Sequence, residues 1–297
     1  MMESIDRRTF LGAIPLTAAA LGCGGGGAEA GADVSEDDAP SGGADRAALL
    51  PAVGVQLYTL RDAITEDLDA VLASLVEIGY TEVELFQLHG LTPGEMRAKL
   101  DAAGLRAASS HYGLPALRED LARHVEGALE IGQELMVVPS IDGAERSPDG
   151  LARVAEDFNR IAETVREAGM RFGYHNHDWE FRPFDDGTVP MEMLLDRTDP
   201  ALVDWQMDIF WTVHGGADPL EALETRSGRV TSAHVKDRTV DGQMVDVGDG
   251  VIDFAEVLSA ARGHGLLHAF VEHDAPGDAV RSVRRSYEHL SGIGVVS

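Results

Sequence analysis

The sequence predicts a single α/β domain of the (β/α)8-barrel class, also called a TIM barrel. Short apolar strands alternate with amphipathic helices from residue 51 to residue 297, a pattern that favours a parallel sheet. Eight such units can be counted, and eight units close into a barrel more naturally than they wind into an open sheet. The segment also has the length of one barrel, about 250 residues. The alternative is an open dinucleotide-binding sheet, but no G-x-G-x-x-G motif follows the first predicted strand.

The predicted strands are short apolar runs. In chain order they span residues 53–58, 81–86, 105–109, 135–139, 170–174, 202–208, 230–235 and 266–271. Five of them follow a glycine at the end of a helical pattern, namely Gly79, Gly104, Gly132, Gly169 and Gly265. Glycine suits a helix end because it adopts the left-handed conformation without a Cβ penalty.

Three helix starts are marked by capping residues. Thr92, Asp218 and Asp253 each place a side-chain acceptor at a predicted N-cap and are followed three residues later by a glutamate. A proline stands at the first helical position after Thr92 and after Asp218, where its missing N–H has no cost. These signals fix where three of the predicted helices begin.

The first fifty residues lie outside the predicted barrel. Arg7 and Arg8 precede an apolar run of about nine residues, 13–21, which is far shorter than the roughly 20 that a membrane-spanning helix needs. This is the pattern of a twin-arginine export signal, so we expect export to the periplasmic or extracellular side. Cys23, the only cysteine, ends the run and is expected to carry a lipid anchor, with plain secretion as the alternative. The predicted lipoprotein signal therefore spans residues 1–23.

Residues 24–50 are rich in glycine, alanine and acidic residues, and they contain few large aliphatic side chains. Such a segment cannot bury enough apolar surface to offset the entropy of ordering it, so we expect a flexible tether. The only membrane contact that the sequence predicts is the anchor at Cys23.

The composition excludes nucleic acid as a partner. The chain has 51 acidic and 24 basic residues and a formal net charge of −27, which repels a phosphate backbone. No pattern in the sequence sets an oligomeric state.

Residues that can bind a metal ion stand at the ends of the last four predicted strands. They are His175, Asp208, His234 and Glu272, and His177 is an alternative to His175 because both point to the same side of a strand. Functional groups of such barrels gather where the strands end. Imidazole and carboxylate ligands together suit Mn²⁺, Fe²⁺, Co²⁺ or Zn²⁺, so we expect one divalent ion.

Several motifs carry a resemblance to a known family. They are GVQLYTLRD at 54–62, SSH at 109–111, YHNH at 174–177, HVKD at 234–237, VGDG at 247–250 and FVEHD at 270–274. Together they resemble the xylose-isomerase-like barrel proteins known as sugar phosphate isomerases/epimerases, and the likeness runs from about residue 53 to residue 290.

The resemblance implies a metal quartet of Glu, Asp, His and Glu on strands five to eight. Asp208, His234 and Glu272 match it, but His175 stands where the first glutamate is expected. In the family the two glutamates also act as bases on opposite faces of the substrate, so this pair is broken. Glu180 lies close by in the sequence and is a candidate to replace the missing glutamate.

The expected substrate is a sugar or keto-sugar. A divalent ion polarises its carbonyl and stabilises the enediolate that forms when a base removes the α-proton. We expect Glu272 to be this base, supported by Glu180. His111 and His177 are candidates for the acid, because a histidine with a pKa near ~6.5 can donate a proton at neutral pH. Residues expected to bind the substrate are Gln56, Tyr58, Glu84 and Lys236.

One base and one acid favour β-elimination, as in relatives that dehydrate keto-inositols or cleave 3-keto-glycosides. The predicted function is therefore a metal-dependent lyase or dehydratase. One alternative is a ketose isomerase or epimerase. Another, from a different class, is a lipid-anchored barrel that binds sugar without turnover. A phosphorylated substrate is not favoured, because the loops after the last two strands are acidic.

Overall fold

The structure is a computed structural model that describes residues 48–297. The predicted export signal, Cys23 and most of the predicted tether lie outside these residues. No helix in the described part of the chain is both long and apolar enough to cross a membrane.

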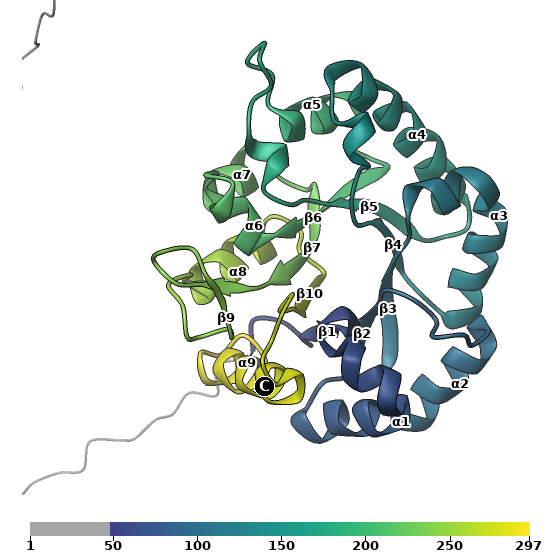
Figure 1. The fold of residues 1–297 in the computed structure, drawn as a ribbon, viewed down its shortest axis with the longest axis vertical. Helices are drawn as coiled ribbons and strands as arrows, with labels where there is room; N and C mark the ends of the chain where they lie inside the picture. Colours follow the sequence, from purple (N-terminus) through teal and green to yellow (C-terminus); the bar gives the residue numbers. More distant parts are fainter. Residues whose placement is uncertain (1–47) are drawn as a thin grey trace, which may run out of the picture. The chain divides into compact units, whose positions relative to one another are not determined.

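Eight parallel strands close into a barrel, which confirms the predicted fold class (Figure 1). Around the barrel the order is β1, β10, β7, β6, β5, β4, β3, β2. The strands are β1 (Gly54–Gln56), β2 (Glu82–Leu85), β3 (Arg106–His111), β4 (Leu135–Val138), β5 (Arg171–His175), β6 (Val203–Asp208), β7 (Val230–Val235) and β10 (His268–Val271). Two further short strands, β8 (Asp237–Arg238) and β9 (Met244–Val245), form a separate antiparallel hairpin.

Helices surround the barrel and cover its outer face (Figure 1). They are α1 (Arg61–Ile78), α2 (Pro93–Ala103), α3 (Leu114–Ile131), α4 (Pro148–Glu167), α5 (Pro190–Arg197), α6 (Ile209–His214), α7 (Pro219–Thr225), α8 (Phe254–Gly263) and α9 (Ala279–Gly292). Three 3-10 helices lie at strand ends or in loops: η1 (Leu57–Leu60), η2 (Gly143–Glu145) and η3 (Trp179–Phe181).

The predicted residues at the starts and ends of the helices are confirmed. Gly104 and Gly132 end α2 and α3 in the left-handed conformation, with φ of 83° and 87°. Thr92 forms a complete capping box with Glu95 at the start of α2. Asp253 accepts a hydrogen bond from the backbone N–H of Glu256, as a side-chain cap should.

The first strand is shorter than predicted. Its last residue is Gln56, and the chain then turns into η1. The side chain of Gln56 causes this turn, because its oxygen accepts a hydrogen bond from the backbone N–H of Tyr58 at 3.1 Å. Tyr58 therefore leaves the barrel wall and is 39% exposed.

The apolar core lies between the strands and the helices. Phe158 of α4 packs against Phe172 and Tyr174 of β5, with ring centroids 5.5 Å apart in each pair. Inside the barrel, by contrast, the residues near the strand ends are polar and fully buried, as Gln56 and Glu84 illustrate. Burying polar groups is costly unless they bond to one another, so this interior is the place to look for function.

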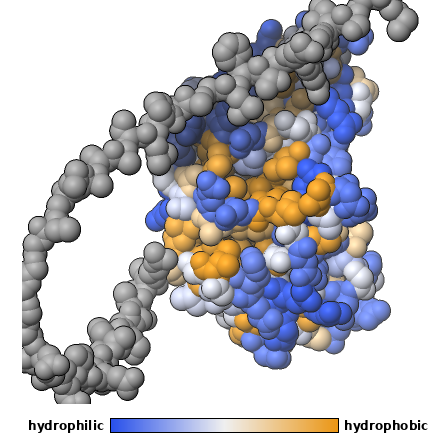
Figure 2. Space-filling view, turned by 90° about the vertical axis from the view of Figure 1, so that its left-hand side faces the viewer, coloured by the Kyte–Doolittle hydropathy of each residue, from blue (hydrophilic) through white to orange (hydrophobic). Residues whose placement is uncertain are grey.

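The chain enters the barrel at the N-terminal ends of the strands. The backbone N–H groups of Leu49 and Leu50 donate to the carbonyl oxygens of Gly294 and Val295, at 3.1 and 2.8 Å. These bonds fasten the entry of the domain to its last residues. Figure 2 views the molecule from the left-hand side of Figure 1, and there hydrophobic residues gather across the middle of the face, with mostly hydrophilic residues above and below them.

Candidate functional site

A cavity of about 540 Å³ opens at the C-terminal ends of the strands. Six of the residues predicted for the site line it: Tyr58, His111, His175, His177, Lys236 and Glu272. Phe86, Trp211 and Asp274 line it as well and were not predicted. The cavity wall thus combines aromatic rings with imidazoles, carboxylates and one ammonium group.

Four other predicted residues lie behind this wall or beside it. Gln56, Glu84, Asp208 and His234 are all completely buried. Glu84 is the centre of the inner group, since its Oε1 accepts a hydrogen bond from Gln56 Nε2 at 2.8 Å. The structure therefore does not place Gln56 and Glu84 on the surface of the cavity, where a direct contact with substrate was expected.

Gln206 completes this inner group and was missed by the sequence analysis. Its Nε2 donates to Glu84 Oε2 at 2.7 Å, and its Oε1 lies 2.9 Å from His111 Nε2 and 3.1 Å from His175 Nδ1. Its position gives a signal that could have found it, because it lies two residues before Asp208 on the same face of β6.

His234 of β7 lies between two carboxylates. Its Nδ1 is 2.6 Å from Glu272 Oε2, and its Nε2 is 2.6 Å from Glu84 Oε1. Burial opposes protonation of the ring, but the charges of Glu272 and Glu84 outweigh it and raise the pKa of His234 to about 10. With this pKa the ring of His234 is an imidazolium at pH 7 and donates from both nitrogens.

Lys236 places a buried ammonium group among three carboxylates, one of which is Glu272. Its Nζ lies 2.9 Å from Asp208 Oδ2, 2.7 Å from Glu272 Oε2 and 2.7 Å from Asp274 Oδ1. Burial disfavours the charge, yet the three carboxylates raise the pKa of Lys236 well above its usual value. Conversely, burial alone would raise the pKa of Glu272, but Lys236 and His234 hold it well below its usual range.

Asp208 carries a buried oxygen that has no hydrogen-bond donor within the described residues. Although Lys236 Nζ is close to its Oδ2, the contact lacks hydrogen-bond geometry, and this oxygen accepts no hydrogen bond from residues 48–297. Burial raises the pKa of Asp208 to about 6 despite the opposing charge of Lys236. A buried carboxylate oxygen without a donor is a ligand atom available to a cation.

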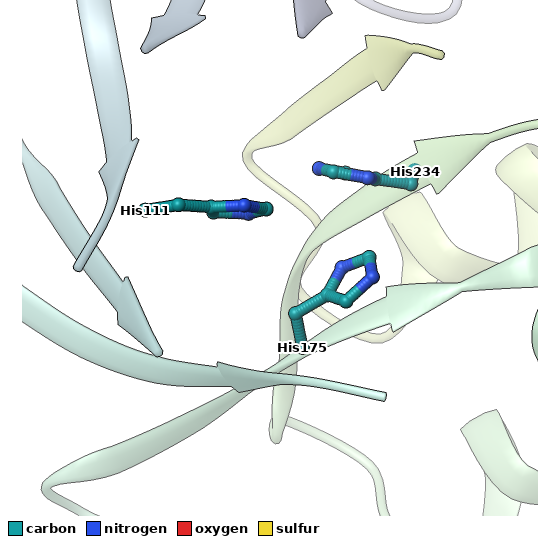
Figure 3. A group of neighbouring side chains, drawn as sticks. All are labelled: His111, His175 and His234. Carbon is teal, nitrogen blue, oxygen red and sulfur yellow. The ribbon is translucent and has the colours of Figure 1, made fainter. Parts of the chain in front are cut away.

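Two groups of side chains could hold a metal ion within the described part of the chain. One is Asp208, His234 and Glu272, and the other is His111, His175 and His234; in each group the ligand atoms lie within 4.8 Å of one another. Figure 3 shows the three imidazoles of the second group, which come from three different strands. The first group contains three of the four predicted ligands. These donors fit a divalent ion of the Mn²⁺ to Zn²⁺ series.

His175 and His177 differ in the donor groups that they can join. His175 belongs to the second group, and its Nε2 lies 3.6 Å from Asp208 Oδ2, so it can also join the first. His177 belongs to neither group. Burial and the charge of Lys236 lower the pKa of His177 to about 4, so its ring is neutral at pH 7. This corrects the premise that His177 has an ordinary pKa near ~6.5 and is ready to act as an acid.

Glu180 does not reach the cavity. It is buried in η3, where it accepts hydrogen bonds from the Tyr174 hydroxyl and from the backbone N–H of His177. Because the side chain of Tyr174 packs outward against α4, Glu180 lies on the helix side of the barrel wall. The structure therefore does not support Glu180 as a replacement for the strand-five glutamate.

Comparisons with known proteins agree with this architecture. The sequence model of the xylose isomerase-like TIM barrel family matches residues 72–291. The inosose dehydratase of Geobacillus kaustophilus (strain HTA426) is 26% identical over 237 residues, which cover 64% of this chain and 74% of that protein.

Two solved structures are also similar. A sugar phosphate isomerase/epimerase from Parabacteroides distasonis ATCC 8503 superposes with a TM-score of 0.73 at 28% identity, covering 84% of this chain and 97% of that one. The IolI protein, solved with a bound zinc atom, gives a TM-score of 0.64 at 14% identity over 82% of this chain and 98% of that one, and this likeness shows the fold alone. The names of the more similar relatives agree with the prediction of an isomerase or lyase.

Proposed function

The chain belongs to the xylose isomerase-like TIM barrel family, and we propose that it is a metal-dependent enzyme that removes a leaving group from a keto-sugar by β-elimination. The observation that carries this proposal is His177: it lines the cavity beside the metal-type ligands, and its ring is neutral. The similarity to an inosose dehydratase supports the same reaction class.

The walls of the cavity suit a sugar ring. Tyr58 and Phe86 meet edge to face with centroids 5.4 Å apart, and Trp211 contributes a third aromatic side chain. The C–H faces of a sugar ring can pack against such rings, while its hydroxyl groups need polar partners. Trp211 offers one of them, since its buried Nε1 has no hydrogen-bond partner among residues 48–297.

The charged side chains of the cavity wall favour a substrate without a phosphate group. Lys236 is the one cationic side chain in the cavity wall of the described domain, and three carboxylates already surround it. A phosphate group would therefore meet negative charge without a free basic partner.

Asp208, His234 and Glu272 would hold the metal ion, as the resemblance implies, and His175 would be the fourth ligand in the place of the family's first glutamate. When bound, the ion would polarise the carbonyl of the keto-sugar and thereby acidify the neighbouring C–H group. Binding would require His234 to lose a proton and Lys236 to release Asp208 Oδ2 and Glu272 Oε2, because these atoms contact one another in the structure.

His177 is the group we assign to proton transfer. Its neutral ring can accept the α-proton as the C–H bond breaks, and the resulting imidazolium can give that proton to the oxygen that leaves the β-carbon. The electron pair of the C–H bond becomes the new carbon–carbon double bond. Glu272, the base expected from the sequence, is a weaker candidate, since Lys236 and His234 hold its pKa well below that of His177.

The test compares two 3-keto-glucosides, one with a nitrophenol leaving group and one with an alkyl alcohol. We expect His177→Ala to slow release of the alkyl alcohol by about 10²–10⁴-fold, the usual contribution of a proton-transfer group. Release of nitrophenolate needs no protonation and loses only the proton-accepting role of His177, so it should fall by a smaller factor than release of the alkyl alcohol, which loses both roles. Glu272→Gln is the comparison for the competing base.

Equal losses on both substrates would exclude His177 as the proton donor. The alternative function is a ketose isomerase or epimerase, which the similarity to the Parabacteroides distasonis protein favours. Epimerisation of ketoses by the wild-type protein, without release of a leaving group, would establish that alternative. Sugar binding without any turnover would indicate the non-catalytic barrel.

A further inference from the structure

We propose that the domain has a second ligand site, which binds a small carboxylate with an apolar body, such as an aromatic acid. The site is a pocket of about 290 Å³ between α2, α3 and the ends of β2 and β3. Figure 1 shows α2 and α3 side by side on the outer face of the barrel. The proposal concerns binding alone and does not depend on the reaction proposed above.

The pocket lies on the other side of the barrel wall from the cavity. Successive side chains of a strand point to opposite faces, and the lining residues follow this alternation. Phe86 and His111 line the cavity, whereas Leu85, Ser110 and Tyr112 line the pocket. His111 lies between the two spaces and contributes to both linings. The pocket therefore belongs to the layer between strands and helices.

A tight turn supplies the apolar part of the pocket. The backbone N–H of Leu91 donates to the carbonyl oxygen of Leu88 at 2.9 Å, and His89 and Gly90 between them have φ of 52° and 80°. A histidine with positive φ is uncommon, so the surrounding structure holds this turn in place. The turn places Leu88 and Leu91 against the pocket, and Ile131 of α3 completes the apolar wall.

The polar side chains beside β3 already bond to one another. The hydroxyl of Tyr112 donates to Gln133 Oε1 at 2.6 Å, and Gln133 Nε2 donates to Ser110 Oγ. Burial raises the pKa of Tyr112 to about 12, so this hydroxyl stays neutral. Recognition of a charged group is therefore left to α3.

Arg123 and His124 of α3 are the polar groups of the pocket that remain available. Within residues 48–297 the guanidinium of Arg123 has no carboxylate at salt-bridge distance and donates no hydrogen bond. The ring of His124 meets Tyr112 edge to face, with centroids 5.6 Å apart. Burial and the charge of Arg123 lower the pKa of His124, so its ring is neutral at pH 7 and can donate one hydrogen bond.

This combination of groups matches an apolar acid. A carboxylate forms paired hydrogen bonds with a guanidinium, and such a pair is stronger beside an apolar wall than in water. Ligand sites usually measure roughly 300–1,000 Å³, so a pocket of about 290 Å³ favours a molecule with one ring. A sugar matches less well, because most of its hydroxyl groups would face leucine and isoleucine side chains.

The experiment measures binding of trans-cinnamate to the full chain by isothermal titration calorimetry, with cinnamamide as the neutral probe of the same shape. Arg123→Gln should weaken binding of cinnamate by at least about 10-fold and leave binding of cinnamamide unchanged, because only the charged pair is lost. Arg153→Gln is the matched control, because Arg153 is exposed on the next helix, α4, and does not line the pocket.

Two further variants locate the bound probe. Leu91→Trp places a larger side chain in the pocket and should prevent binding of both probes. Trp211→Ala changes the wall of the cavity but not the pocket, so it should bind cinnamate like the wild type. Circular dichroism and urea unfolding confirm that each variant is folded. Because Arg123 is exposed, its variant tests the site even if Leu91→Trp does not fold.

Failure of cinnamate to bind the wild-type protein, or equal binding by the wild type and Arg123→Gln, would overturn the second site. Loss of binding in Trp211→Ala but not in Leu91→Trp would place the probe in the cavity and would overturn it as well. These measurements involve no keto-sugar, so their failure leaves the proposed elimination reaction untouched.

Discussion

At the scale of single residues, environment separates side chains that look equivalent in the sequence. His175 and His177 are two positions apart at the end of β5 and both line the cavity, yet only His175 lies among the metal-type donors. Their partners come from β6, β7 and the loop after β7. Such contacts between distant segments give the two histidines their different environments.

Glu180 gives a prediction about stability and pH. Burial raises its pKa to about 7 in the folded protein, against 4.5 for an ordinary glutamate. Between these values the folded protein holds a proton that the unfolded chain has released, so the free energy of unfolding falls as the pH rises from 4.5 to about 7. The loss is on the order of 3 kcal/mol at about 1.4 kcal/mol per pKa unit.

Glu180→Gln should remove this pH dependence. We expect the variant to gain stability relative to the wild type between pH 5 and pH 8 in urea unfolding measurements. Glu119→Gln on the exposed face of α3 is the control and should follow the wild type. A wild type and a Glu180→Gln variant with parallel pH profiles would contradict the raised pKa.

Residue types and strand ends could be predicted at this site, but protonation states could not. Asp208, His234 and Glu272 were recognisable because each lies within one residue of the end of a predicted apolar strand. The pKa of His234 could not be predicted, because it depends on Glu84, which lies 150 residues away in the chain. Gln206 could have been predicted, because alternate residues of β6 face the same side as Asp208. Trp211 could not be found in this way, because it lies in α6, after the end of the strand.

At the scale of elements, helix ends were predicted better than strand ends. Glycines and capping residues act within a few positions of themselves, so Thr92 and Gly104 specify their turns locally. The end of β1 depends instead on a single side-chain bond from Gln56 to the backbone of Tyr58. Glu180 shows the same limit, since only the packing of Tyr174 shows which side of the barrel wall it occupies.

Asp237 explains two of the sequence motifs together. It ends the HVKD segment, and its carboxylate accepts hydrogen bonds from the backbone N–H groups of Gly248, Gly250 and Ile252 at 2.9, 3.0 and 3.2 Å. The VGDG segment therefore wraps around this side chain. Gly250 is required there, because a Cβ atom would lie 2.2 Å from Asp237 Oδ1.

Asp237→Ala should lower the free energy of unfolding by about 2–4 kcal/mol, because three backbone N–H groups of the loop would lose their buried acceptor. Asp241→Ala in the β8–β9 hairpin is the matched control. Its carboxylate contacts the nearby Thr239, so its loss should cost less than about 0.5 kcal/mol. Urea unfolding measures both, and equal effects would show that Asp237 does not hold the loop.

At the scale of the whole molecule, the net charge of −27 contrasts with the site. The excess of acidic residues repels polyanions, while the cavity keeps one ammonium group for its own carboxylates. This combination suits neutral small molecules better than phosphorylated ones. The barrel itself was the most predictable feature, because eight periodic units with their glycines allow few other folds.

The location of the protein remains a prediction of the sequence. Replacing Arg7 and Arg8 by lysine should retain the precursor in the cytoplasm, because the twin-arginine pathway reads this pair. Cys23→Ser should instead release soluble mature protein from the membrane fraction. Fractionation of cells followed by mass measurement checks both, and unmodified wild-type protein free in the cytoplasm would contradict them.

The bonds of Leu49 and Leu50 to the last residues of the chain have a consequence for access to the site. They place the attachment of the N-terminal segment at the pole of the barrel opposite to the cavity. Residue 48, where the described domain begins, therefore lies at the pole away from the cavity mouth, so the first residues of the domain leave access to the cavity unobstructed.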